Sequence, residues 1–219
     1  MIAVIQCAGK KRSDAGTLQC SDGRPVKFVG RPDLAPNDQN FYSSPDSPTD
    51  EGITWREKLI KYNQKGDNPL GLSPAYRLYD RAIYQRLANH VGLDKLFILS
   101  AGWGIIRADF FTPAYDITFS NSARGEKAYQ KRKRCDQYCD FNFLPHTSSE
   151  PIIFFGGQDY LPLFLHLTGG TNNPRYVTLR SKNELDVPGC VPLRYETTRK
   201  TNWHYSCAED FIRGTFRVP

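Results

Sequence analysis

Residues 95–104 read KLFILSAGWG, a short apolar run that ends in a serine and continues into two glycines around a tryptophan. Two more runs have the same form: residues 2–6 (IAVIQ) continue into CAGKK, and residues 151–155 (PIIFF) continue into GGQDY. An uninterrupted apolar run bounded by glycine is typical of a strand buried on both faces of a parallel sheet. The sequence therefore predicts three buried strands, each followed by a polar, glycine-containing loop.

The segments between these runs carry helix patterns. Residues 73–91 begin with Ser-Pro, which suits the N-cap and first turn of a helix, and then repeat apolar residues at helical spacing up to Gly92. A fourth strand is expected at residues 175–179, and further helices at 54–64, 122–138, 161–167 and 202–213. This alternation predicts a mostly parallel central sheet between two layers of helices, a three-layer α/β/α sandwich. The length of 219 residues suits a single domain of this class.

Residues 13–72 differ from the rest of the chain in composition. Pro, Asp, Asn, Gly and Ser dominate there, and only residues 54–64 have a helical pattern. Long irregular segments inside a compact domain are uncommon, and they are usually functional or mobile. We therefore expect an irregular insertion at about residues 13–72 that enlarges or gates the functional site.

The balance of charged and aromatic residues favours a nucleic-acid partner. The net charge is +6, and aromatic residues make up 13% of the chain. Lys and Arg replace the counterions of phosphates, and aromatic rings stack on bases; a mildly basic protein without such a partner is the alternative. No apolar run approaches the roughly 18 residues that suggest a membrane span, and residues 1–7 lack the basic flank of a signal peptide. We expect a cytoplasmic protein with no membrane partner.

The cysteines predict free thiols. The chain has 6 cysteines, and no two of them have C-x-x-C spacing. Cys135 and Cys139 would share one face of a helix, but without nearby histidines they make a poor zinc site. Free thiols are the ordinary state in a reducing cytosol. We expect no metal site and no cofactor.

The loop after the first strand is a candidate ligand site, because ligands of parallel α/β sheets bind beyond the carboxyl ends of the strands. Small residues there let a ligand approach the backbone, and Lys10 and Lys11 can hold an anion. A solvated turn is the equal alternative. A nucleophilic Cys7 would need a basic partner that the sequence does not identify, so packing or substrate contact is the favoured interpretation.

The loop after the second strand offers a ring and a carboxylate. Trp103 between two glycines can be presented for stacking on a base, or it can lie in the core beneath the turn. Ser100 ends the strand and is better placed than Trp103 to hydrogen-bond a ligand. Farther on, Tyr115 and Asp116 can orient a water or stabilise positive charge on a sugar, whereas an Asx turn is the ordinary alternative.

The third loop and a basic segment complete the set of candidates. Gln158 can read the edge of a base, and Asp159 can act as a base or cap the helix that follows, two roles that are compatible. Lys131–Arg134 put four cations in a row on the expected helix at residues 122–138. Such a run is usually a solvated face, but in a chain of net charge +6 it can contact a duplex backbone.

Three segments together resemble the YaaA superfamily. They are residues 4–11 (VIQCAGKK), 96–119 (LFILSAGWGIIRADFFTPAYDITF) and 154–164 (FFGGQDYLPLF), in the order expected for that group. The resemblance covers the first strand and most of residues 73–167, and it leaves out the insertion. It implies a fold like that of the uracil-DNA glycosylases, with a base pocket at the carboxyl ends of the strands. GQDY at residues 157–160 is similar to the glycosylase Gly-Gln-Asp-Pro-Tyr motif, but it lacks the proline and follows the third strand.

We expect a DNA glycosylase that flips a modified base out of duplex DNA and excises it. The length and polarity of the insertion at residues 13–72 suit a bulky base such as a hypermodified phage pyrimidine, and a role in defence against phages would fit such a base. A carboxylate would stabilise the cationic sugar, and Asp116 and Asp159 are the candidates. A non-catalytic DNA-binding stress protein and a base- or nucleotide-modifying transferase are the alternatives. The expected base pocket comprises Gln6, Cys7, Ser100, Gly102, Trp103, Tyr115, Gly157, Gln158 and Tyr160. The expected DNA contacts are Lys10, Lys11, Arg12, Arg107, Lys131, Arg132, Lys133 and Arg134.

Overall fold

The computed structural model describes residues 1–145, 149–180 and 187–219 and contains a mixed α/β fold around a seven-stranded sheet with the order β12-β11-β10-β1-β5-β6-β9. The predicted buried strands are β1 (Ile2–Gln6), β5 (Leu96–Ser100) and β10 (Ile152–Phe155), and the predicted fourth strand is β11 (Arg175–Leu179). All four are confirmed. They and β12 (Val191–Arg194) run parallel. Their spatial order, β5-β1-β10-β11-β12, places the switch point of a doubly wound sheet between β1 and β10.

Two short strands extend this sheet beyond β5. The chain turns back through β6 (Gly104–Arg107), antiparallel to β5, and β9 (Phe141–Asn142) pairs parallel to β6. The turn needs glycine, because Gly104 has a φ of 85° and a Cβ atom there would lie 2.4 Å from the carbonyl oxygen of Phe141. Strands β6, β9 and β12 were not predicted from the sequence.

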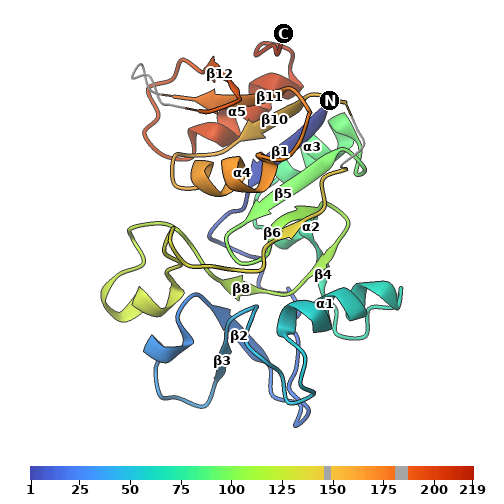
Figure 1. Cartoon of the computed structure of the whole chain (residues 1–219), viewed down its shortest axis with the longest axis vertical. Helices are drawn as coiled ribbons and strands as arrows, with labels where there is room; N and C mark the ends of the chain where they lie inside the picture. Colours follow the sequence, from blue (N-terminus) through green and yellow to red (C-terminus); the bar gives the residue numbers. More distant parts are fainter. Residues whose placement is uncertain (146–148, 181–186) are drawn as a thin grey trace.

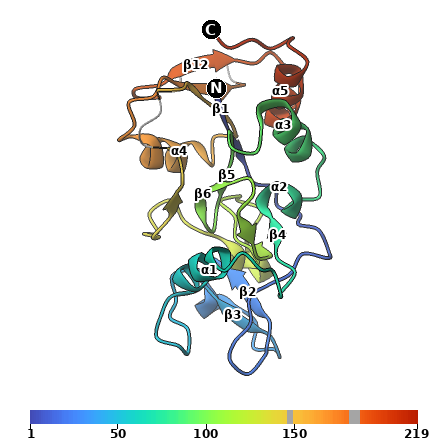
Figure 2. The same cartoon turned by 90° about the vertical axis from the view of Figure 1, so that its right-hand side faces the viewer.

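Helices cover both faces of the main sheet. Figure 2 shows α4 (Leu161–Thr168) on one side and α3 (Ile83–Val91) with α5 (Trp203–Ile212) on the other. The predicted helices at 161–167 and 202–213 are confirmed. The single helix predicted at 73–91 is wrong: Ser73–Pro74 form β4, paired with β7 (Phe111–Thr112), and α2 (Ala75–Leu78) ends before α3 begins. The break lies at Tyr79, whose extended backbone pairs with Lys11.

Residues 13–72 are more ordered than predicted. Figure 1 shows them in the lower half of the molecule, where β2 (Val26–Val29), β3 (Phe41–Ser43) and β8 (Tyr115–Asp116) form a small parallel sheet. We call this part the small-sheet lobe; it also contains η1 (Pro32–Leu34) and α1 (Trp55–Gln64). The predicted helix at 54–64 is confirmed, and Thr54 and Glu57 form a capping box at its start.

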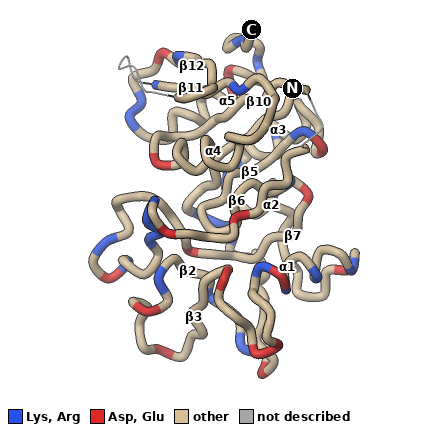
Figure 3. The backbone as a smooth tube through the Cα atoms, viewed as in Figure 1, with Lys and Arg blue, Asp and Glu red and all other residues tan. Residues whose placement is uncertain are grey.

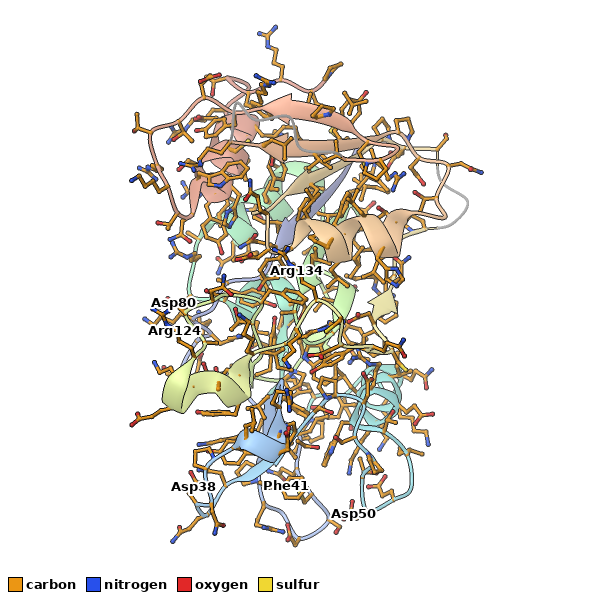
Figure 4. All side chains as sticks on the ribbon, turned by 60° about the vertical axis from the view of Figure 1, so that its left-hand side comes forward. Asp38, Phe41, Asp50, Asp80, Arg124 and Arg134 are labelled. Carbon is orange, nitrogen blue, oxygen red and sulfur yellow. The ribbon has the colours of Figure 1, made fainter. Side chains whose placement is uncertain are left out.

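The core of the small-sheet lobe continues into the main sheet. The ring of Phe28 packs edge-on against Trp55 at 5.7 Å and against Trp103 at 5.1 Å between centroids. Asp38, Phe41 and Asp50 lie at the tip of the lobe, far from the main sheet (Figure 4). The strands within residues 13–72 were not predictable from the sequence pattern, because they are short and contain few apolar residues.

The basic helix predicted at residues 122–138 is absent. The segment forms a short 3₁₀ helix, η2 (Gly125–Gln130), and then extended chain in which Lys131 pairs with Thr118. The backbone of Lys131 packs directly on Gly30, where a Cβ atom would lie 2.6 Å from the Lys131 carbonyl carbon. Tertiary contact with the small-sheet lobe therefore overrides the helical pattern. No helix in the described residues is long and apolar enough to cross a membrane.

Candidate active site

A cavity lies at the switch point of the sheet. It has a volume of about 570 Å³ and is lined by the ends of β1, β10 and β11, by the start of α5, and by residues 116–122 beside the small-sheet lobe. This is the position at which open α/β sheets bind ligands. Of the predicted pocket and catalytic residues, the cavity brings together Gln6, Cys7, Asp116, Gly157, Gln158, Asp159 and Tyr160, and it is also lined by Lys11, which was predicted as a DNA contact.

The loops after β1 and β10 are held to each other at the cavity floor. The backbone N–H of Gly157 donates to the side-chain oxygen of Gln6 at 2.6 Å, and the Tyr84 hydroxyl donates to the Gln6 carbonyl at 2.8 Å. Gly156 leaves room for the Phe154 ring, because a Cβ atom there would lie 2.0 Å from it. Gln6 therefore fixes the two loops with its amide oxygen and leaves the exposed Gln158 to contact a ligand.

Tyr160 lines the cavity, and two further buried phenols, Tyr79 and Tyr115, lie in the layer behind it. The Cys7 thiol and the Tyr160 hydroxyl share a hydrogen bond of 3.2 Å, and the hydroxyls of Tyr79 and Tyr115 share one of 2.9 Å. Burial raises the pKa of Tyr79, Tyr115 and Tyr160 well above the ordinary value of 10. These phenols stay protonated at neutral pH, so they can donate hydrogen bonds. All six cysteines are free thiols, as predicted.

Lys11 reaches into the same cavity. Its ammonium lies 3.8 Å from the centroid of the Tyr115 ring and donates to the Gly9 carbonyl at 3.3 Å. Burial lowers the pKa of Lys11 from its ordinary 10.5, and the nearby Cys7 and Asp116 partly offset that shift. The cavity thus presents a half-buried amine.

The two candidate carboxylates both line the cavity, but they differ in whether an arginine is paired with them. Asp116, at the end of β8, is exposed, and within the described residues its carboxylate forms no ion pair or side-chain hydrogen bond. Asp159 accepts a hydrogen bond from Arg134 at 3.1 Å and also borders a second cavity of about 400 Å³. The predicted cap by Asp159 is absent, since the N-cap of α4 is Tyr160 and no side chain caps it. Asp116 is the carboxylate that is free to meet a developing positive charge.

The turn after β5 does not reach the cavity. Trp103 is fully buried beneath Phe28, so the prediction that its ring stacks on a base is wrong. Ser100 and Gly102 are buried as well. The Ser100 hydroxyl donates to Tyr115 at 2.8 Å and accepts the N–H groups of Gly102 and Trp103. Ser100 and Tyr115 therefore support the cavity from behind.

Two buried arginines hold this turn by its carbonyl groups. Arg56 of α1 donates to the carbonyls of Gly102 and Trp103, each at 3.1 Å. Arg132 donates to the Ala101 carbonyl at 2.9 Å and forms a buried ion pair with Asp140. The prediction that Arg132 contacts DNA is therefore wrong, because its guanidinium is enclosed in the protein. We call Arg56 and Arg132 the arginine clamp.

Most of the predicted phosphate contacts are already paired with acids. Lys10 pairs with Asp80 at 2.6 Å, Arg12 with Asp14 at 2.6 Å, Arg107 with Asp109 at 3.0 Å, and Arg134 with Asp159 at 3.1 Å. Arg107 is also at the wrong edge of the sheet, because β6 runs back toward the amino end of β5 and Arg107 lies opposite Phe97. Segments with Lys or Arg and segments with Asp or Glu are both spread over the whole backbone (Figure 3). Lys131 and Lys133 lie on the extended segment after η2. Figure 4 shows Arg134 between the main sheet and the small-sheet lobe.

Residues of α5 contribute to the cavity, although the sequence did not predict them as site residues. His204 and Tyr205 line the cavity, and Tyr205 shares a hydrogen bond of 3.3 Å with Tyr84. His204 is buried, and its Nε2 atom has no hydrogen-bond partner in the described residues. Burial, with the nearby Arg81, lowers the pKa of His204 to about 3, so the imidazole is neutral. The run Trp-His-Tyr at the start of the predicted helix was the sequence feature that could have indicated these cavity residues.

No cluster of three metal-ligating side chains occurs in residues 1–145, 149–180 and 187–219. No protein-family model, curated protein or solved structure matches the chain. The function therefore has to be inferred from the geometry of the cavity.

Proposed function

We propose that this protein is a DNA glycosylase that cleaves the N-glycosidic bond of a modified base. The observation that supports the proposal best is the free carboxylate of Asp116 on the wall of the switch-point cavity, next to Lys11. A volume of about 570 Å³ is in the range of small-molecule sites. It suits one flipped nucleotide, which an enzyme of this kind must take out of the base stack.

The reaction needs negative charge beside the sugar. When the bond between C1′ and the base nitrogen breaks, the electron pair leaves with the base and positive charge develops on C1′ and the ring oxygen. Asp116 stabilises that charge and takes the proton of the water that adds to C1′. Lys11 donates a proton to the departing base nitrogen. A lowered lysine pKa makes its ammonium a stronger acid for that step.

The phenol and amide groups of the cavity suit recognition of a polar base edge. Tyr160 is held by the thiol of Cys7, and Gln158 is exposed in the loop that Gln6 anchors. A site built to hydrogen-bond a ligand discriminates against analogues that leave its buried polar groups unpaired. His204 lines the same cavity with a neutral ring, and its buried Nε2 atom has no hydrogen-bond partner in the described residues. A base with additional polar substituents fits these groups better than thymine does.

A second candidate is a transferase or hydrolase that acts on a free nucleotide. It is favoured by the pairing of Lys10, Arg12 and Arg134 with acids, because paired cations contribute little to binding a long polyanion. Such an enzyme would use the same carboxylate on the same bond. The two candidates differ in the substrate that is turned over.

The test is a base-release assay with the whole chain. Duplexes with ordinary bases, uracil or hypermodified phage bases, and the corresponding free nucleotides, are incubated with the protein, and DNA is then treated with alkali. Alkali-labile breaks support the glycosylase, and base release from free nucleotides alone supports the second candidate. Asp116→Asn is expected to lower the rate by roughly 10²–10⁴-fold. Asp109→Asn is the matched control, an exposed aspartate at the far edge of the sheet. Duplex binding with no base release from any substrate would contradict both candidates.

A further inference from the structure

Lys11 is held in a fixed position at the cavity. The chain on either side of it is anchored, because Lys11 pairs with Tyr79 and the N–H of Arg12 donates to the Leu78 carbonyl at 2.9 Å. Its amine lies over the Tyr115 ring, and Tyr115 is itself held by Ser100 and Tyr79. The side chain is therefore positioned by two layers of contacts.

The neighbouring lysine shows the contrast. Lys10 has an exposed side chain paired with Asp80 at 2.6 Å, which is the ordinary state of a surface lysine. Lys11 lines the cavity and forms no ion pair within the described residues. The only hydrogen bond of its amine to the described part of the chain goes to the Gly9 carbonyl, so the remaining N–H groups are available to a ligand.

The surroundings of Lys11 suit a nucleophile. Burial lowers its pKa, which increases the fraction of the neutral amine, and Asp116 lies close enough to influence its charge. Desolvated lysines of this kind form Schiff bases with carbonyl compounds. The proposed glycosylase reaction uses Lys11 as an acid and does not use its amine as a nucleophile.

We propose that Lys11 is a Schiff-base nucleophile that cleaves DNA at abasic sites by β-elimination. The neutral amine attacks the C1′ aldehyde of the open-chain sugar, and loss of water leaves an imine between Nζ and C1′. Asp116 removes a proton from C2′, the electrons form the C2′–C3′ double bond, and the C3′–O bond breaks to release a 5′-phosphate end. Water then hydrolyses the imine and restores Lys11. This activity rests on the proposed function only in taking the sugar as the ligand of the cavity.

The experiment supplies the abasic site directly, so base excision is not needed. The full chain is mixed with a duplex that carries one abasic site, in the presence of sodium cyanoborohydride, which reduces an imine to a stable amine. A covalent protein–DNA complex is expected on a denaturing gel, and its peptide map is expected to place the sugar on Lys11. Without the reductant, the strand is expected to break at the abasic site. If the adduct forms but the base-release assay shows no release, the glycosylase proposal is contradicted and the proposal for Lys11 is supported.

The variants separate chemistry from charge. Lys11→Arg keeps a cation but cannot form the imine, so the adduct is expected to vanish while binding to abasic duplex remains. Lys58→Arg is the matched control, because Lys58 is another poorly exposed lysine with its amine over an aromatic ring, 5.3 Å from the Trp55 centroid. An adduct mapped to another amine, an adduct that persists in Lys11→Arg, or no adduct in the unaltered chain would each overturn the proposal. The map of the unaltered chain decides the question even if a variant fails to fold.

Discussion

The turn after β5 and the loop after β10 look alike in the sequence, but they have opposite positions in the structure. Both follow a buried strand, and both contain glycine and an aromatic residue. The first is buried and held by the arginine clamp, whereas the second lines the cavity with Gln158, Asp159 and Tyr160. The difference arises from what covers each loop. The small-sheet lobe packs on the first, and nothing in the described residues fills the space beside the second.

Removing Arg132 is expected to have the largest effect on this difference. The variant Arg132→Met leaves Asp140, whose side chain is 5% exposed, as a buried charge without its partner. Breaking a buried ion pair costs about 3–5 kcal/mol of stability, which urea unfolding would measure. Arg134→Met in the same segment removes a pair whose side chains are 59% and 47% exposed, and it is expected to change little. Equal effects of the two variants would show that Arg132 does not hold the turn.

Arg56→Met tests the other half of the clamp. It leaves the carbonyls of Gly102 and Trp103 without their donor and removes the ion pair with Asp46. We expect a loss of about 2–3 kcal/mol in the free energy of unfolding. The loss in the Arg56→Met/Arg132→Met double variant is expected to differ from the sum of the two single losses, because both arginines hold one turn. Strict additivity would argue against a shared role.

The cavity wall has its own pH dependence through His204. The pKa is about 3 in the folded chain and near its ordinary 6.5 when unfolded, so the unfolded state binds more protons between these values. Stability is then expected to rise with pH across that window, and to fall as pH drops below 6.5, by up to about 1.4 kcal/mol per pH unit. In His204→Phe this part of the slope should disappear from the dependence of unfolding free energy on pH. A slope that is unchanged in the variant would assign it to other groups.

The smallest effects on stability are expected from two aromatic substitutions, one in the loop after β10 and one in the turn after β5. Tyr160→Phe removes a hydroxyl that is hydrogen-bonded to Cys7, and it is expected to cost about 0.5–1.5 kcal/mol. Ligand binding should weaken, because the hydroxyl borders the cavity. Trp103→Phe is the counterpart in the covered turn, and it is expected to lower stability without changing the Kd of the ligand. Calorimetric titration of both variants would check this. Weaker ligand binding by Trp103→Phe would indicate that the Trp103 ring belongs to the binding site after all.

Much of the main sheet could be predicted from local pattern. The apolar runs that form β1, β5 and β10 are nearly uninterrupted, so burial on both faces is visible in the residues themselves. The loops after β1 and β10 followed from the rule that ligands bind beyond the carboxyl ends of parallel strands, and both line the cavity. Helix α1 was predictable because Thr54 and Glu57 mark its start.

Other features depended on contacts between distant segments. Helicity at residues 122–138 was overridden by the packing of Lys131 on Gly30, and the helix at 73–91 was broken by the pairing of Tyr79 with Lys11. The partners of Arg132 are Ala101 and Asp140. No local pattern distinguishes such a buried arginine from the exposed Arg134 two positions later.

Sequence alone was sufficient for the parallel strands β1, β5, β10 and β11 and for two of the three predicted loops, because a buried strand and its exit turn are short-range features of hydrophobicity and glycine content. The tertiary structure decided which loop stays open, which cations are neutralised by acids, and which residues of α5 complete the cavity. These depend on side chains far apart in the chain, such as Cys7 with Tyr160 and Tyr84 with Tyr205. Their proximity is set by how the main sheet and the small-sheet lobe pack together, which no local pattern encodes.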